Sequence, residues 1–215
     1  MFYAEEIDMN TLRFGDVVQG YVGMVPYIEN PINSNILRGY EYKIESYFPE
    51  FSVIMTPCCS IGKNTISLVP LNKITSDIYG RISTEVIKNF ELLNSKIEPE
   101  KLYAEEIWEK YFDDQRRAEE TDKGKALAYL EYFFYKGHDI FEEYEIIARD
   151  KKYIINDYLI DFKEIYQVKC NKIIRDNIKD EILSSKCLQL SIKMRGYLRD
   201  KLSYYYGRIP KEDII

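Results

Sequence analysis

Two adjacent cysteines, Cys58 and Cys59, are the residues of this sequence best placed to do chemistry. They follow the apolar run 52–56 and Pro57, and the loop after a strand is a common position for nucleophiles. A thiol nucleophile needs a base, and His138 is the single histidine of the chain. We expect both cysteines to pack structurally at the end of a strand, with a thiol-dependent activity centred on the pair as the alternative.

The sequence carries no recognisable metal or nucleotide motif. A single histidine cannot build a multi-histidine metal site, and no neighbouring residue completes a ligand spacing. Residues 60–63 contain Gly-Lys but lack the first glycine of a phosphate-binding loop. Residues 20–23 hold two glycines, but no helix pattern follows them. We therefore expect no metal and no cofactor.

The composition is typical of a folded cytoplasmic protein. With 215 residues, 46% of them hydrophobic, the chain can bury an ample core. Four cysteines, two of them adjacent, do not form the framework of a secreted disulfide-rich domain. The acidic N-terminus lacks the basic and apolar regions of a signal peptide. No apolar run approaches the ~18 residues of a membrane span, so we expect no membrane association.

The net charge of −6 is unevenly distributed. The C-terminal part has six cations against the single anion Asp200; they are Lys186, Lys193, Arg195, Arg199, Lys201 and Arg208. A basic helix on an acidic body can contact a phosphate backbone or an acidic partner surface. The global acidity argues against broad coating of nucleic acid. We expect Lys193, Arg195, Arg199 and Arg208 to bind a partner or a nucleic acid.

Alternating apolar residues and turn signals predict strands in two parts of the chain. Glycines at positions 20 and 23 predict a bend within the first strand, and the polar run 150–152 predicts the turn of a hairpin. Together the strands predict a small, strongly bent sheet or barrel. The predicted strands are residues 17–25, 41–47, 52–56, 65–69, 127–135, 145–149, 153–155, 158–162 and 165–168. For residues 127–135 a helix capped by Asp122 and Gly137 is the alternative.

Helical spacing of apolar residues predicts three helices. The first begins at Ser83 and the second at Pro99, a residue favoured in a first turn. The third is capped by Ser184 or Ser185 and runs to about Tyr206.

Three short motifs give the chain a resemblance to a known family. Phe14-Gly15-Asp16-Val17-Val18, the strand ending Thr56-Pro57 and the strand ending Val69-Pro70 resemble the MazF/PemK-type toxins, which have an SH3-like barrel. This resemblance covers about residues 13–75. The whole chain is more loosely similar to uncharacterised bacterial proteins with a Thr-Gln-Ser-Cys-Asp-like loop. Those proteins end in an arginine-bearing helix, as this chain ends near Gly207-Arg208-Ile209-Pro210.

The resemblance implies a toxin-type endoribonuclease, for which Arg38, Thr56 and Thr75 are the candidate catalytic residues. Where the toxins have Arg-Pro before the central strand, this chain has Glu50-Phe51, and a carboxylate there would repel a scissile phosphate. We therefore expect a non-catalytic or weakly catalytic module of a bacterial stress-response or antiviral defence system. It would bind a protein partner encoded nearby, or RNA or DNA; the endoribonuclease is the alternative.

These patterns predict an α+β protein, an SH3-like β-barrel with a helical insertion and a C-terminal helix. Residues 1–72 would form the N-terminal part of the barrel and residues 73–128 the helical insertion. Residues 129–170 would complete the sheet, and residues 171–215 would form a C-terminal helical segment.

Overall fold

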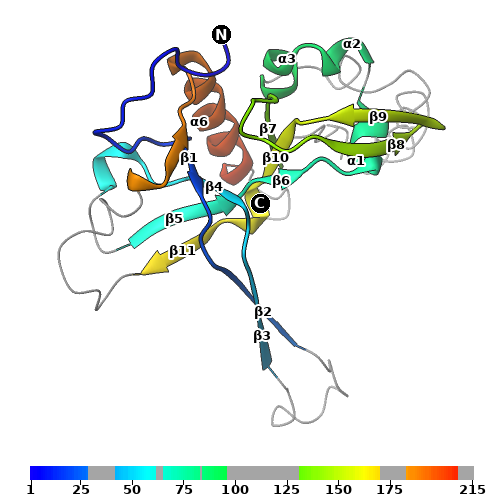
Figure 1. The fold of residues 1–215 in the computed structure, drawn as a ribbon. Coiled ribbons are helices and arrows are strands. Elements are labelled where there is room, and N and C mark those ends of the chain that lie inside the picture. Colours follow the sequence, from blue (N-terminus) through cyan, green and yellow to red (C-terminus); the bar gives the residue numbers. More distant parts are fainter. Residues whose placement is uncertain (29–41, 62–64, 83, 96–130, 170–182, 208–215) are drawn as a thin grey trace, which may run out of the picture.

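The largest element of the fold is a five-stranded antiparallel sheet (Figure 1). The computed structural model describes residues 1–28, 42–61, 65–82, 84–95, 131–169 and 183–207. The strand that follows Gly15-Asp16 lies in this sheet together with the two strands of the Thr56-Pro57 and Val69-Pro70 motifs, as predicted. In spatial order its strands are β11 (Tyr166–Lys169), β5 (Thr65–Pro70), β4 (Phe51–Ile54), β1 (Val17–Gln19) and β12 (Lys186–Leu188).

A three-stranded sheet continues the first one around a corner. Its order is β6 (Asn72–Lys73), β10 (Tyr158–Asp161) and β7 (Tyr132–Tyr135). Only Leu71 separates β5 from β6, and the short 3-10 helix η3 (Phe162–Glu164) separates β10 from β11. The same two stretches of chain, 65–73 and 158–169, thus pair with each other in both sheets: β5 pairs with β11, and β6 pairs with β10. The antiparallel sheets with few helices agree with the predicted α+β class, but the described strands do not close into the predicted barrel.

Two hairpins extend from these sheets. The strands β2 (Gly23–Ile28) and β3 (Tyr42–Tyr47) form a ribbon that projects away from the body (Figure 1). Gly20 and Tyr21 both have positive φ, so the predicted strand 17–25 breaks into β1 and β2. The second hairpin pairs β8 (Tyr144–Ala148) with β9 (Lys151–Ile155). Its turn is the residue pair 149–150, both with positive φ as in a type I′ turn, rather than the predicted 150–152.

Three short helices follow β6: α1 (Ser76–Arg81), α2 (Thr84–Ile87) and α3 (Phe90–Asn94). The helix predicted from Ser83 is interrupted, because the Asn89 side chain accepts hydrogen bonds from the first amides of α3 and starts a new helix there. The helix α1 was not predicted. The helix predicted at Pro99 lies outside the described residues, as does most of the proposed insertion 73–128.

The C-terminal helix α6 (Ile192–Tyr206) begins later than predicted. Its N-cap is Ser191, whose hydroxyl accepts from the Met194 amide, so the predicted cap at Ser184 or Ser185 is wrong. The intervening residues form β12, which pairs with β1. An extended strand buries Leu188 and supplies the hydrogen bonds that the edge of β1 needs. The segment 171–215 therefore contributes a strand to the sheet as well as a helix.

Both faces of the curled sheet are buried. The main core lies between the two sheets and α6, where Met194 and Leu198 are fully buried. The helices α1 to α3 and the second hairpin cover the other face of the three-stranded sheet. Burial on both faces explains why β7 is a run of four aromatic residues: Phe133 and Tyr135 face the main core, and Phe134 faces the helices. None of the described helices has the length and apolar character to span a bilayer.

Candidate functional site

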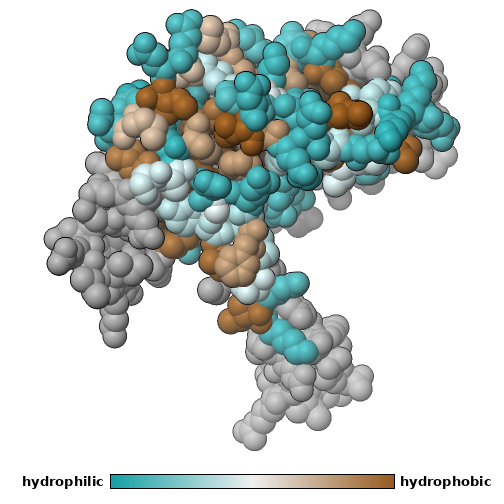
Figure 2. Space-filling view, viewed as in Figure 1, coloured by the Kyte–Doolittle hydropathy of each residue, from teal (hydrophilic) through white to brown (hydrophobic). Residues whose placement is uncertain are grey.

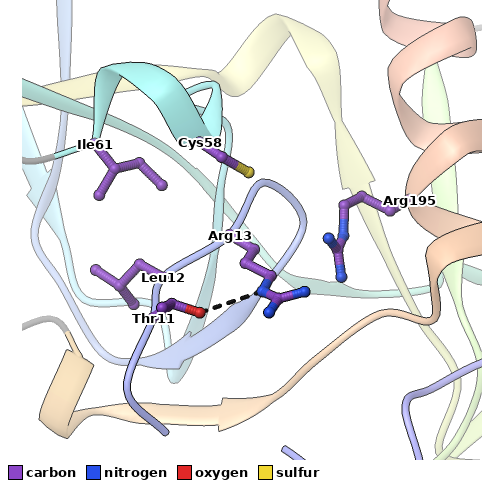
Figure 3. A pocket seen from close by; sticks show the side chains of 6 residues that line it. All are labelled: Thr11, Leu12, Arg13, Cys58, Ile61 and Arg195. Carbon is purple, nitrogen blue, oxygen red and sulfur yellow. Dashed lines mark hydrogen bonds between the residues drawn. The ribbon is translucent and has the colours of Figure 1, made fainter. Parts of the chain in front are cut away.

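A pocket of about 400 Å³ lies where three distant parts of the chain meet (Figure 3). The loop before β1 supplies one wall, the 3-10 helix η1 (Cys58–Ser60) after β4 supplies another, and α6 supplies the third. A volume of this size is within the range of small-ligand sites. The pocket is lined by Thr11, Leu12, Arg13, Cys58, Ile61 and Arg195.

The position of Cys58 follows from the end of β4. Thr56 is buried, and its hydroxyl accepts a hydrogen bond of 2.6 Å from the Ser67 amide. Pro57 then turns the chain into η1. The amide of Phe14 donates to the Cys58 sulfur at 3.3 Å, which ties η1 to the loop before β1. Cys58 itself is exposed.

Arg13 is held in the pocket by acidic and hydroxyl partners. Its Nη2 lies 2.9 Å from Asp8 Oδ2, and its Nε donates to Thr11 Oγ1 at 3.2 Å. Hydrogen bonds from Thr11 and from a neighbouring amide, with the guanidinium, lower the pKa of Asp8 to about 2. Asp8 is therefore ionised at neutral pH and neutralises part of the Arg13 charge.

Arg195 extends from α6 toward Arg13, and the Cys58 sulfur is directed to the same space (Figure 3). Its Nη2 donates to the Leu190 carbonyl at 3.2 Å. In the described part of the chain its buried Nε has no hydrogen-bond partner and no carboxylate forms a salt bridge with Arg195, although its charge opposes the rise in the pKa of Asp16. Because a buried atom is out of reach of a ligand, only the part of the guanidinium that lines the pocket can contact one.

A buried ion pair supports this wall of the pocket. Lys186 Nζ lies 2.7 Å from Asp16 Oδ2, and both side chains are 0% exposed. Lys186 also donates to the carbonyls of Asp8 and Thr11 at 2.8 and 3.0 Å, while Asp16 accepts from the Arg13 amide at 2.8 Å. Burial raises the pKa of Asp16, and the contact with Lys186 opposes that rise. The pair therefore anchors the backbone that carries Arg13.

The electrostatic balance of the site favours an anion. Three cations, Arg13, Arg195 and Lys186, stand against the two carboxylates Asp8 and Asp16. The two guanidinium groups line the pocket itself, whereas the buried pair lies behind it. Guanidinium groups present several N–H donors in a plane and match phosphate and carboxylate oxygens.

Only one of the four predicted binding cations lines this pocket. Arg195 does so; Lys193 instead pairs with Glu91 at 2.5 Å, and Arg199 pairs with Asp200 at 3.0 Å. Arg208 lies outside the described residues.

The residues considered for ribonuclease or thiol chemistry fall in different places. Thr56 holds the backbone of β5 through the Ser67 amide, and Thr75 is the N-cap of α1, accepting from the Ile78 amide at 3.3 Å. Arg38 lies outside the described residues. Cys58 lines the pocket, and the side chain of its neighbour Cys59 is not described.

Arg13 is not among the predicted binding residues, and the prediction for Lys186 is wrong. Lys186 lies on β12 and is paired with Asp16, outside the predicted basic helix. A signal for the pair was present: Asp16 directly precedes the apolar Val17 and Val18, so its carboxylate had to be buried with a cation. The described residues contain no group of three or more potential His, Cys, Asp or Glu metal ligands.

Comparisons with known proteins found no match to this chain among protein-family models, curated proteins or solved structures.

Proposed function

We propose that the chain is a non-catalytic binding module that captures a phosphate group of single-stranded RNA in the pocket between Arg13 and Arg195. The observation that carries this proposal is that two guanidinium groups, those of Arg13 and Arg195, line one pocket. The setting we propose is a bacterial stress-response or antiviral system, as the resemblance to MazF/PemK-type toxins suggests. The curled sheet is compatible with a divergent, incompletely closed SH3-like barrel.

Phosphate suits the pocket better than a carboxylate does. One guanidinium fork satisfies both oxygens of a carboxylate, whereas a phosphate has further oxygens for a second guanidinium. Arg13 and Arg195 reach the pocket from opposite walls, so a single phosphate between them could accept from both.

The charge distribution favours capture of one phosphate over binding along a strand. The other cations on the outer face of α6, Lys193 and Arg199, are already paired with carboxylates. The net charge of −6 would repel an extended polyanion elsewhere on the surface. A weak salt dependence, equivalent to one or two phosphates, is therefore expected.

Binding without cleavage is supported by the roles of the two threonines. Thr56 and Thr75 each accept a backbone hydrogen bond, which gives both hydroxyls a structural role. Glu50, directly before β4, is a carboxylate where the toxins have an arginine.

The test is binding of a fluorescent RNA hexamer carrying a 5′-phosphate. Arg195→Gln and Arg13→Gln should each weaken binding about tenfold or more, since each removes a charge-assisted contact. The matched control is Arg199→Gln, which makes the same change on α6 at an exposed position outside the pocket and should bind as the wild type does. Equal affinity of the wild type and both pocket variants would refute the proposal.

The same incubation separates binding from the ribonuclease alternative. We expect the RNA to remain intact on a denaturing gel at a large excess of protein. Cleavage that persists with the purified Arg13→Gln variant, but is lost when Arg38 is substituted, would favour the toxin-type endoribonuclease instead.

A protein partner is the second candidate, and the projecting ribbon favours it. Ile44 and Phe48 are 69% and 77% exposed, and hydrophobic side chains are visible on the ribbon in Figure 2. Exposed apolar side chains of this size are common at interaction surfaces. Co-purification with the products of neighbouring genes tests this, with Ile44→Lys as the variant expected to release the partner.

A further inference from the structure

The thiol of Cys58 opens into the same pocket as the two guanidinium groups. It is exposed, and the Phe14 amide donates to its sulfur at 3.3 Å. By contrast, Cys187 is partly buried, its thiol contacts the Val17 carbonyl at 3.4 Å, and burial raises its pKa to about 11. Cys58 is therefore the more reactive of the two cysteine side chains that the structure describes.

We propose that Cys58 is a site of thiol–disulfide exchange with small disulfides that carry carboxylates, which Arg13 and Arg195 hold beside the sulfur. The inference rests on the cationic pocket of the proposed function and adds a regulatory reaction to it. One observation supports it independently of the cysteine: two guanidinium groups, those of Arg13 and Arg195, line the pocket into which the thiol opens. Each can pair with a carboxylate of the disulfide.

The exchange is balanced without a further reactant. The Cys58 thiol loses its proton to solvent, and the thiolate attacks one sulfur of the disulfide. The bond between the two sulfurs breaks as the new bond to Cys58 forms. The other half leaves as a thiolate and takes up a proton, so Cys58 is oxidised to a mixed disulfide and the released half is reduced. The Phe14 N–H would stabilise negative charge on the attacking sulfur.

The mixed disulfide would switch off phosphate binding. The attached half would fill part of the 400 Å³ cavity and place its carboxylates on Arg13 and Arg195. A bound phosphate and the attached group would then compete for the same donors. Reduction by excess thiol would restore binding.

The experiment compares two reagents of opposite charge, oxidised glutathione and cystamine, on the full chain. Mass spectrometry measures the rate at which each reagent modifies Cys58. The rate with oxidised glutathione divided by the rate with cystamine is a ratio in which differences in folding or exposure between variants cancel. In Arg195→Gln the ratio should fall about fivefold at low salt, because one cation near the bound carboxylate is lost. The control Arg199→Gln, an exposed change on the same helix, should keep the wild-type ratio.

Salt provides a measurement that needs no variant. Raising the ionic strength to about 1 M shortens the screening length to roughly 3 Å and should bring the wild-type ratio close to that of Arg195→Gln. A ratio that responds neither to salt nor to Arg195→Gln and Arg13→Gln overturns the proposal. Modification that falls mainly on Cys59, Cys170 or Cys187 overturns it as well.

Failure of this inference can be distinguished from failure of the proposed function. The variant Cys58→Ser should bind the phosphorylated hexamer as the wild type does. If it binds while the wild-type exchange shows no preference for oxidised glutathione, the exchange site is wrong and the phosphate site stands. If neither protein binds RNA but Cys58 still prefers oxidised glutathione, the RNA proposal is wrong and the thiol site stands.

Discussion

Lys201 shows how burial changes the behaviour of a single residue. It is buried on α6, donates to the Leu93 carbonyl at 2.7 Å and lies 5.8 Å from the ring centre of Phe134. No carboxylate is paired with it in the described part of the chain. Burial lowers its pKa to about 7 from the usual 10.5. The sequence placed Lys201 among the cations of a basic helix and gave no sign of this.

We predict that Lys201 makes the free energy of unfolding rise with pH between about 7 and 9, below the range in which the raised pKa of Cys187 acts in the opposite direction. In this range the folded protein has lost the Lys201 proton, while the unfolded chain still binds it, so raising the pH favours the folded state. The slope contributed by this group approaches about 1.4 kcal/mol per pH unit. Urea unfolding at several pH values measures it.

Lys201→Met should remove this contribution to the slope. Lys193→Met is the matched control, because Lys193 is on the same helix but exposed and paired with Glu91, and it should keep the wild-type slope. Identical slopes for all three proteins would show that Lys201 is not buried as described.

At the scale of elements, a close approach between a loop and a helix determines where α6 lies. Gly15 precedes β1 with φ of +84°. A Cβ at this position would lie 2.8 Å from Leu190 Cδ1 and 3.1 Å from Leu198 Cδ2. Both leucines are fully buried in the main core, so neither can move aside easily. Gly15 therefore lets the N-terminal half of α6 pack against the start of β1.

We predict that Gly15→Ala destabilises the protein by about 2–4 kcal/mol, from backbone strain together with overpacking. Gly20→Ala separates the two effects, because Gly20 also has a positive φ, of +78°, but nothing lies within 4 Å of its Cβ position. This control should cost about 1–2 kcal/mol from strain alone. Chemical denaturation of both variants measures the difference. Equal losses of stability would contradict the packing contact.

Most strands were predictable from local pattern, and the errors are instructive. Pro57 and the residues 65–69 define β4 and β5 correctly, because alternation and a proline stop are local signals. The start of α6 was placed too early because residues 186–190 have no local feature that favours a strand over a helix. Their pairing with β1 and the burial of Leu188 and Leu190 depend on residues far away in the sequence.

For the whole molecule, the C-terminal segment completes a core that the rest of the chain builds. The strand β12 pairs with β1, and Met194 and Leu198 fill the main core between the two sheets. Without them, the edge of β1 and the apolar faces of β7 and β10 would be exposed to water. The segments 1–72 and 129–170, predicted to form one sheet, and the predicted C-terminal helical segment 171–215 share this one core in their described parts.

We predict that a chain ending at residue 182 does not fold by itself. Loss of β12 and α6 removes several fully buried side chains, each worth about 1.5–3 kcal/mol, from a protein of ordinary marginal stability. Circular dichroism during a urea titration should show no cooperative transition. Co-expression with a second chain of residues 183–215 should restore it. A cooperative transition of the truncated chain alone would show that the C-terminal segment is an accessory part.

The sequence by itself determined the alternating strands, the bend after β1 and the amphipathic character of α6, because these depend on neighbouring residues. It also placed Cys58 in the loop after a strand, but favoured a packed cysteine, whereas Cys58 is exposed. The tertiary structure alone decided that Arg13 and Arg195 meet at that thiol and that Lys186 and Lys201 are buried. These positions depend on how the curled sheet brings both ends of the chain together, and contacts between distant segments leave no local pattern in the sequence.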